Sequence, residues 1–182
     1  MFYYDLIVCS LSIIFWTYLI YAIWEIAHHR APFVPATGTH KKQAITKISE
    51  LLDKKQTPQT IVDAGCGNGC VLATLATKYP NHQFIGIEYN KTLCNYCEQH
   101  YKNIKNLTFL NQDMLTYDYE TVDIIYYFGI PALTEGLQNV LLKTSKTIDL
   151  ISIEQAFPKL NLIEKQPFRF LLTHSFVYHY KN

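Results

Sequence analysis

The sequence predicts an α/β fold with a doubly wound, mostly parallel sheet, preceded by one N-terminal transmembrane helix. Beyond residue 39, apolar runs of strand length alternate with helical patterns, as in parallel sheets. A glycine turn joins the first such run to the helix that follows it. Residues 6–24 form an uncharged stretch close to the length that crosses a bilayer. We therefore predict an anchor over 1–30, a proline-containing linker over 31–38 and the α/β domain over 39–182.

The composition of the chain argues against nucleic-acid binding, a disulfide framework and a zinc site. The chain has 182 residues, enough for one domain and an appendage, and its net charge of +1 gives no basic balance for nucleic acid. Its five cysteines do not indicate a disulfide framework. Cys94 and Cys97 form a C-x-x-C inside a helical pattern, with no second pair at zinc spacing. We expect packed, reduced thiols and no metal, with a metal or redox role as the alternative.

The stretch over 6–24 carries aromatic residues at both ends, as interfacial belts do. A cleaved signal peptide and a buried core helix are the alternatives. The start is acidic rather than basic and no small-residue cleavage site follows, which disfavours the signal peptide. Because His28, His29, Arg30, Lys41 and Lys42 all follow the stretch, the positive-inside rule places the C-terminal domain on the cytosolic or matrix-equivalent side.

The domain opens with a helical pattern from Thr39, after the two linker prolines. The elements that follow alternate in type until the C-terminal part of the chain. We expect 159–166 to be irregular, 169–180 to form edge strands, and both His174 and His179 to lie on the surface. The other expected elements are strands over 60–63, 82–88, 107–110, 121–128 and 147–153, and helices over 70–78, 91–101 and 133–142.

The glycine turn is the clearest functional signal. Gly65, Gly67 and Gly69 follow the first strand, permit backbone angles closed to other residues, and let a ligand approach the main chain. A turn between a strand and a helix start also offers free N–H groups to a nucleotide-like molecule. The spacing G-x-G-x-G differs from the dinucleotide pattern G-x-G-x-x-G. An ordinary strand-to-helix turn is the alternative.

Acidic residues stand at the ends of successive strands. Asp63 ends the first, and Glu88 ends the second, 25 residues later. A carboxylate at that place can accept hydrogen bonds from both ribose hydroxyls, as the acid of dinucleotide folds does. Asn90 follows on the loop, where helix capping competes with contact to a ligand.

The segment Val62–Gly69 resembles motif I of the class I, seven-stranded S-adenosylmethionine-dependent methyltransferases. The resemblance implies that S-adenosylmethionine is the cofactor. It implies that the glycine turn lies under the methionine part and ribose, that Asp63 orients the cofactor's amino group, and that Asp113 and the Met114 N–H bind adenine. The expected cofactor-binding residues are Asp63, Ala64, Gly65, Cys66, Gly67, Gly69, Glu88, Asn90, Asp113 and Met114.

A narrower resemblance rests on the anchor, the compact size and Pro32-Phe33-Val34-Pro35. Together they look like the membrane-anchored protein-lysine methyltransferases related to the mitochondrial enzyme that modifies the c subunit of ATP synthase. That group usually has Asp where this chain has Asn68. The resemblance implies a lysine acceptor on a membrane-associated protein, with the Pro-Phe-Val-Pro segment folded over the pocket; a rigid connector is the alternative.

The acceptor side is less defined, and no catalytic residue is assigned. Enzymes that act on amides or base amines often carry Asn/Asp-Pro-Pro-Tyr after the fourth strand, but this chain has Phe-Gly-Ile-Pro. Tyr126 and Tyr127 point to opposite faces, so one is expected in the core. Substrate-channel candidates are Phe33, Tyr126, Tyr127, Phe128 and Pro131. The rivals are a nicotinamide oxidoreductase, a small-molecule or lipid methyltransferase, and a non-catalytic adaptor with this fold.

Overall fold

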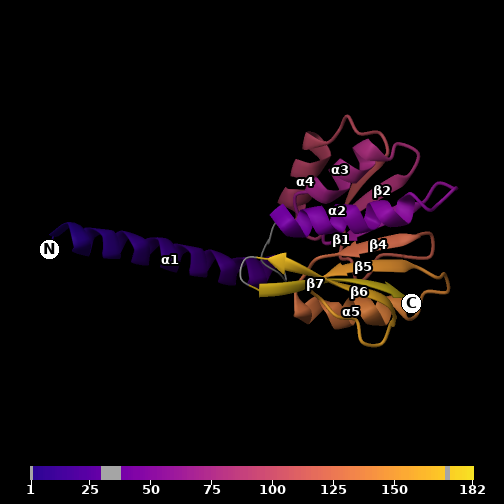
Figure 1. Ribbon diagram of the computed structural model, residues 1–182. Coiled ribbons are helices and arrows are strands. Elements are labelled where there is room, and N and C mark those ends of the chain that lie inside the picture. The colour runs from indigo at the N-terminus through magenta and orange to yellow at the C-terminus, as the bar shows by residue number, and fades with distance from the viewer. Residues whose placement is uncertain (1, 30–37, 171–172) are drawn as a thin grey trace. The chain divides into compact units, whose positions relative to one another are not determined.

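The computed structural model describes residues 2–29, 38–170 and 173–182 (Figure 1). The chain divides into two compact units, Met1–Val34 and Pro35–Asn182. Helix α1, Phe2–His29, forms the first unit. The second contains four helices and seven strands within the described residues. The Pro-Phe-Val-Pro segment, including Phe33, lies outside the described residues.

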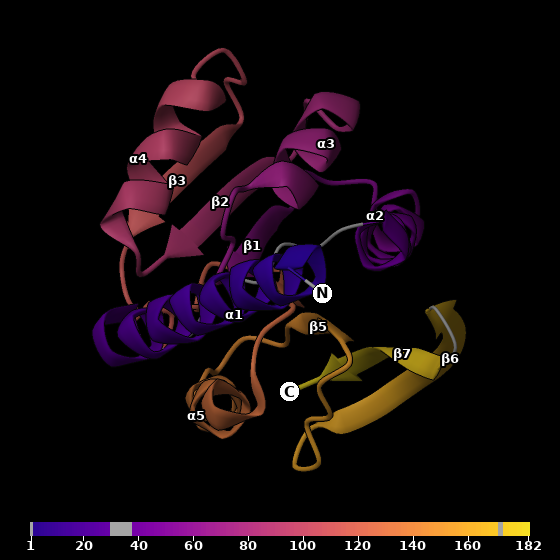
Figure 2. The same cartoon turned by 90° about the vertical axis from the view of Figure 1, so that its left-hand side faces the viewer.

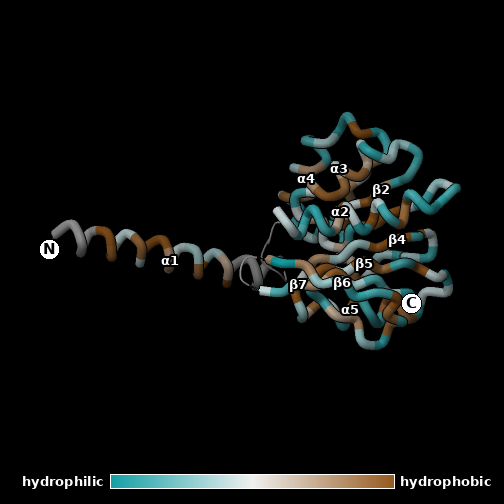
Figure 3. The backbone as a smooth tube through the Cα atoms, viewed as in Figure 1, coloured by the Kyte–Doolittle hydropathy of each residue, from teal (hydrophilic) through white to brown (hydrophobic). Residues whose placement is uncertain are grey.

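Helix α1 exposes most of its apolar side chains. Over residues 7–23 these include Ile7, Leu11, Ile14, Trp16 and Ile20, each more than half exposed. Figure 3 shows brown, hydrophobic stretches along this helix. No helix in the described ranges is both long enough and apolar enough to cross a membrane. The transmembrane prediction for 6–24 is therefore not supported, although a helix does form there and ends at His29, beside the predicted boundary.

The sheet confirms the predicted α/β class. Its strand order is β3-β2-β1-β4-β5-β7-β6, with β1 to β5 parallel and β7 antiparallel to both neighbours. The chain passes from β1 outward to β3 and then returns to β4 on the other side of β1, which is the doubly wound arrangement. The strands are β1 Thr60–Ala64, β2 Gln83–Glu88, β3 Leu107–Asn111, β4 Ile124–Tyr127, β5 Asp149–Ile153, β6 Asn161–Phe170 and β7 Thr173–Lys181.

Among the differences from the predicted elements, two have a clear physical reason. Strand β4 begins at Ile124 instead of Thr121, because Val122 N–H donates to the Tyr119 carbonyl and closes a turn first. The segment 159–166 is not irregular, since β6 starts at Asn161 and pairs along its length with β7. Strand β6 is an exposed edge strand that contains Pro167. Its sequence therefore lacks the alternation of apolar and polar residues by which a strand is predicted.

Helices cover both faces of the sheet (Figure 2). α2, α3 and α4 share one buried cluster with the sheet, to which Ile48, Leu72 and Cys97 contribute. α5 packs on the other face through Leu137, in a cluster that includes Tyr127. The bounds are α2 Gly38–Leu52, α3 Cys70–Lys78, α4 Lys91–His100 and α5 Pro131–Leu141.

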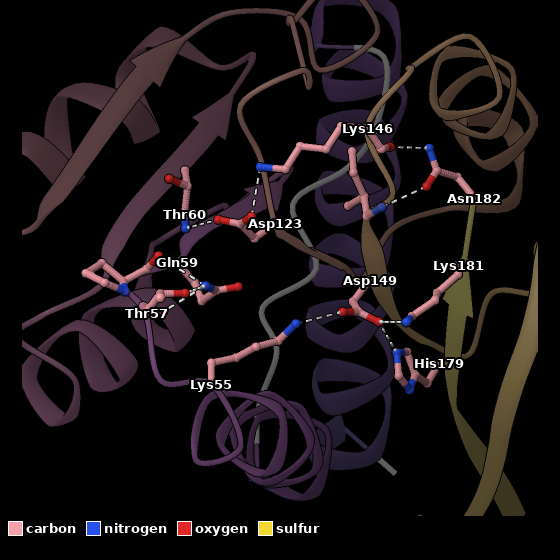
Figure 4. Close-up of polar contacts among 12 residues, drawn as sticks. Lys55, Thr57, Gln59, Thr60, Asp123, Lys146, Asp149, His179, Lys181 and Asn182 are labelled. Carbon is pink, nitrogen blue, oxygen red and sulfur yellow. Dashed lines mark hydrogen bonds and ion pairs between the residues drawn. The ribbon is translucent and has the colours of Figure 1, made fainter.

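Strands β1 to β5 are parallel, so their carboxyl ends lie together along one side of the sheet and their amino ends along the opposite side. We call these two sides, formed by strand ends and not by outer strands, the carboxyl edge and the amino edge. At the amino edge Asp149 contacts His179 Nε2 at 2.7 Å and Lys55 Nζ at 3.6 Å (Figure 4). Nearby, Asp123 accepts from Thr60 N–H and Lys146 Nζ, both at 2.8 Å. The surface prediction for His179 is wrong, because its pairing with Asp149 keeps the side chain buried.

Candidate functional site

The glycine turn lies at the carboxyl edge, between β1 and α3. Gly65, Gly67 and Gly69 have φ values of 91°, 54° and 69°, all in the left-handed region that favours glycine. Gly65 and Cys66 donate their N–H groups to the Ile87 carbonyl at 3.0 and 2.9 Å, which fastens the turn to β2. A Cβ added at Gly65 would meet no atom within 4 Å. The backbone here is therefore open to close approach by a ligand.

Glu88 holds the turn from the neighbouring strand. One carboxylate oxygen accepts from Gly67 N–H at 2.8 Å, and the other accepts from Asn90 N–H at 2.8 Å. These bonds fix the carboxylate at the carboxyl edge beside the turn. Glu88 ends β2 as predicted and fastens the glycine turn, while its contact with the ribose stays a prediction.

Asn90 caps a helix, which is one of the two roles that the sequence allowed for it. Its side-chain oxygen accepts from Thr92 and Leu93 N–H at 2.9 and 3.3 Å and caps α4. The side chain is buried. Its contact with a cofactor stays a prediction.

Asp63 is buried at the end of β1, with 4% of its surface exposed. Burial raises the pKa of its carboxyl group well above the ordinary range, and the nearby charge of Glu88 raises it further. Tyr126, its register partner on β4, has a buried hydroxyl with no hydrogen-bond partner among the described residues. A carboxylate without an ion-paired cation beside an unsatisfied hydroxyl fits the ammonium and sulfonium end of S-adenosylmethionine.

The loop after β3 carries the other predicted cofactor residues. Asp113 accepts from Leu115 N–H at 2.9 Å through a side-chain oxygen. Met114 is buried, and its carbonyl accepts from the Tyr119 hydroxyl at 2.9 Å. The loop therefore has a fixed conformation at the same edge as Asp63 and Glu88.

The thiols near the turn are packed into the fold. Cys97 Sγ donates to the Gly67 carbonyl at 3.2 Å, and a hydrogen bond with Cys97 together with burial raises the pKa of Cys66. Burial raises the pKa of Cys94 to about 11. Over residues 2–29, 38–170 and 173–182, no group of three or more His, Cys, Asp or Glu residues is arranged to hold a metal.

The acceptor candidates separate by environment. Tyr127 packs in the core beneath α5, where its hydroxyl donates to the Ile130 carbonyl at 3.0 Å. Tyr126 is buried on the opposite face, beside Asp63. Phe128 is half-buried at the carboxyl edge, and Pro131 is exposed at the first turn of α5. Phe128 lies in a cluster of aromatic side chains at the carboxyl edge.

That cluster contains residues the sequence analysis missed. His40 of α2 contacts Phe128, Phe168 and Phe170 and bonds to Glu154, which follows β5. The strand-end argument that singled out Glu88 applies equally to Glu154 and was a usable signal. His40 had no such signal, because its neighbours are far away in sequence.

Residues 61–147 match the family described as "Methyltransferase domain". The fold is similar to that of an RNA methyltransferase from Salinibacter ruber, solved with S-adenosyl-L-homocysteine, at 17% identity and TM-score 0.65, covering 81% of this chain and 93% of that one. It is also similar to the N-methyltransferase NodS from Bradyrhizobium japonicum, at 11% identity and TM-score 0.60, covering 81% and 99%.

A third similar structure is a SAM-dependent O-methyltransferase from Thermotoga maritima, at 15% identity and TM-score 0.61, covering 86% of this chain and 69% of that one. No curated protein sequence matches the chain significantly. Residues 61–147 thus match a methyltransferase domain, the fold is that of class I methyltransferases, and S-adenosylmethionine is the cofactor that these similarities indicate.

Proposed function

We propose that this methyltransferase transfers a methyl group to a lysine of a membrane-associated protein. The observation that carries the cofactor part is the convergence of the glycine turn with Asp63, Glu88 and Asp113 at one edge of the sheet. Carboxylates at this edge complement a ligand that carries a sulfonium and an ammonium group.

The cofactor supplies an electrophilic methyl on a sulfonium, and the chain's residues position and desolvate the reactants. Alignment of acceptor and methyl contributes most of the acceleration in such a displacement. A lysine must first lose a proton, because an ammonium has no lone pair. The aromatic surroundings of Phe128 can hold the amine while a base takes its proton.

An amine acceptor agrees with the sequence after β4. Residues 128–131 lack the Asn/Asp-Pro-Pro-Tyr of enzymes that modify amides and base amines, and the net charge of +1 does not favour nucleic acid. A small molecule or a lipid remains the alternative acceptor, and a non-catalytic adaptor the alternative role.

The membrane part of the proposal rests on α1. Its exposed apolar side chains are unfavourable in water and favour attachment to lipid. By the positive-inside rule, the basic residues that follow the helix, Arg30, Lys41 and Lys42, would place the domain on the cytosolic or matrix-equivalent side. Attachment restricts the site to a layer near the bilayer and raises the effective concentration of membrane-associated acceptors.

Methyl-labelled S-adenosylmethionine added to a membrane lysate tests the activity and the acceptor together. We expect a labelled protein band whose methyl maps to lysine, and no band with Asp63→Asn. A methyl found on nucleic acid, lipid or a small metabolite, with no modified lysine, would overturn the acceptor and leave the cofactor standing. Cofactor binding without any transfer would favour the adaptor.

Liposome flotation of the full chain tests the membrane attachment. We expect the protein to float with the vesicles, and a double variant with Ile13→Asp and Ile14→Asp to remain in the soluble fraction. Thr17→Ser on the same helix is the matched control and should float. Equal recovery of all three proteins in the soluble fraction would contradict the attachment.

A further inference from the structure

The carboxyl edge carries a second cluster of side chains beside the glycine turn, centred on His40. His40 is buried, with 7% of the residue exposed, and lies in the first turns of α2. Phe128 follows β4, Glu154 follows β5, and Phe168 and Phe170 end β6. Because β7 is antiparallel to both β5 and β6, β6 runs in the same direction as β5 and ends at the same edge.

The β6–β7 hairpin extends beyond the end of β5. Ile153 and Gln166 are both in register with Val177, so Phe168 and Phe170 lie past the last residue of β5. This extension brings the two rings to the side of His40. The cluster therefore depends on a hairpin longer than the strand it pairs with.

Three aromatic rings surround the imidazole. The ring centroids of Phe170, Phe128 and Phe168 lie 4.1, 5.2 and 5.5 Å from that of His40. The Phe128 ring stacks on the imidazole at 24°, and the Phe168 ring meets it edge-on at 87°. The electron-rich faces of aromatic rings attract cations, so such walls suit an alkylammonium and an imidazolium alike.

Glu154 fixes the orientation of the imidazole. His40 Nε2 lies 3.2 Å from a Glu154 carboxylate oxygen. A carboxylate can only accept, so Nε2 carries the proton and the lone pair of the neutral ring lies on Nδ1. Glu154 is also the only non-glycine residue with positive φ, 67°, in the described chain. Backbone strain of this kind persists where surrounding structure enforces it, and it is concentrated at functional sites.

The cluster adjoins the cofactor site through two connections. Phe128 stands two residues after Tyr126, whose register partner is Asp63. Burial raises the pKa of Cys70 at the start of α3, which follows the glycine turn directly, and the charge of Lys41, next to His40 on α2, partly offsets that rise. Strand β4, through Phe128, and helix α2, through Lys41, thus both connect the His40 cluster with the region of the glycine turn.

We propose that His40 is the catalytic base that receives the proton of the acceptor amine, with Glu154 as its positioning residue and Phe128, Phe168 and Phe170 as walls of the acceptor site. The proton passes from the acceptor ammonium to Nδ1 of His40. The freed nitrogen lone pair forms the bond to the methyl carbon, and the electron pair of the breaking carbon–sulfur bond stays on sulfur. Glu154 stabilises the resulting imidazolium.

The charged groups around His40 set the expected pH dependence. Glu154 is bonded to the imidazole, Lys41 is its neighbour on α2, and Arg169 stands between the two phenylalanines of β6 with an exposed side chain. This inference rests on the proposed function, because it assumes an amine acceptor.

A binding experiment tests the site without knowledge of the natural acceptor. The full chain, saturated with S-adenosylhomocysteine, is titrated with n-butylammonium while NMR follows the imidazole signals of His40. We expect saturable shifts, and affinity about tenfold weaker in Glu154→Gln. His100→Gln, which removes an exposed histidine stacked on Tyr96, is the matched control and should bind as the wild type does. An unperturbed His40 in the wild type would overturn the proposal.

Single-turnover methyl transfer to lysate protein tests the proton transfer. His40→Gln should lower the rate about 10²–10⁴-fold. S-adenosylhomocysteine affinity should stay within about twofold in the same variant, which separates this test from the cofactor assignment. The wild-type rate should rise with pH through an imidazole titration, and Glu154→Gln should move that titration to lower pH, since it removes the charge that stabilises the imidazolium.

Imidazole added to His40→Ala should restore part of the rate. A rate and pH profile left unchanged by His40→Gln would overturn the role of His40. If the wild type transfers no methyl, the proposed function fails, and the butylammonium titration alone decides whether the amine site exists.

Discussion

The two edges of the sheet differ in whether their carboxylates have cationic partners. At the amino edge, Asp149 lies within reach of three basic side chains, and Asp123 has a backbone N–H and a lysine (Figure 4). At the carboxyl edge, Asp63 forms no ion pair with any described residue and faces the charge of Glu88. Acids that join elements at the amino edge are thus paired with cations, whereas one acid without an ion pair lies at the edge where we propose that the cofactor binds.

The pKa directions express the same difference. Hydrogen bonding to His179 and nearby positive charges outweigh burial and lower the pKa of Asp149. Burial and Glu88 raise the pKa of Asp63. The stability that Asp149 contributes is lost as pH falls through its lowered pKa. For Asp63, folding is favoured while the carboxyl is protonated, and this contribution is lost as pH rises through its raised pKa.

The largest expected effect is at the amino edge. Asp149→Asn should destabilise the fold by about 3–5 kcal/mol, because it removes the charge from a buried pair and leaves His179 without its carboxylate. Urea unfolding followed by circular dichroism measures the loss. Glu98→Gln, an exposed acid on α4, is the control and should change stability little. A change under about 1 kcal/mol in Asp149→Asn would show that the amino edge is not a stabilising region.

Asp63→Asn should act in the opposite direction. Removal of an uncompensated buried charge should stabilise the ligand-free protein by about 1–3 kcal/mol and should reduce the pH dependence of its stability. The same change should weaken S-adenosylmethionine at least tenfold by calorimetry, since the cofactor's ammonium loses a negative partner. If Asp63→Asn destabilises the ligand-free fold as much as Asp149→Asn does, the claim that only the amino-edge acid stabilises the fold is wrong.

Glu88 at the carboxyl edge can be compared with Glu120 at the amino edge, because both carboxylates accept hydrogen bonds from a neighbouring loop. The test variant is Glu88→Gln. Loss of a charge-assisted bond costs about 1.5–3 kcal/mol, so cofactor affinity should fall about tenfold or more. Glu120 is the matched residue at the amino edge, because it accepts from the N–H and hydroxyl of Ser145 at 2.9 and 2.6 Å. Glu120→Gln should leave affinity unchanged; an equal loss in both variants would place the effect in the fold.

The smallest effect is expected at the surface of the amino edge. Lys146→Met removes the cation 2.8 Å from Asp123, but both side chains are partly exposed. Solvent screens such pairs, so we expect a loss of about 0.5 kcal/mol, detectable as a small shift of the urea midpoint. A loss comparable to that of Asp149→Asn would mean that burial does not decide which pair matters.

Prediction from sequence succeeded where the signal is local. The glycine turn, the strand-end positions of Asp63 and Glu88, and the parallel core strands each depend on spacing within a few residues. The same rule would have found Glu154 after β5. It failed for β6, whose exposed edge position removes the apolar alternation, and for His179, whose burial depends on Asp149 thirty residues away.

The sequence by itself determined the class of fold and the positions of the glycine turn and of the strand-end acids, because backbone freedom at glycine and carboxyl groups at strand ends are properties of single positions. Only the tertiary structure decided which carboxylates are compensated and which aromatic rings surround His40. Those outcomes depend on contacts such as Glu154 with His40, 114 residues apart, and Lys47 with Glu164, 117 residues apart. Strand order and the length of the β6–β7 hairpin bring such groups together, and neither is set by the spacing of the residues themselves.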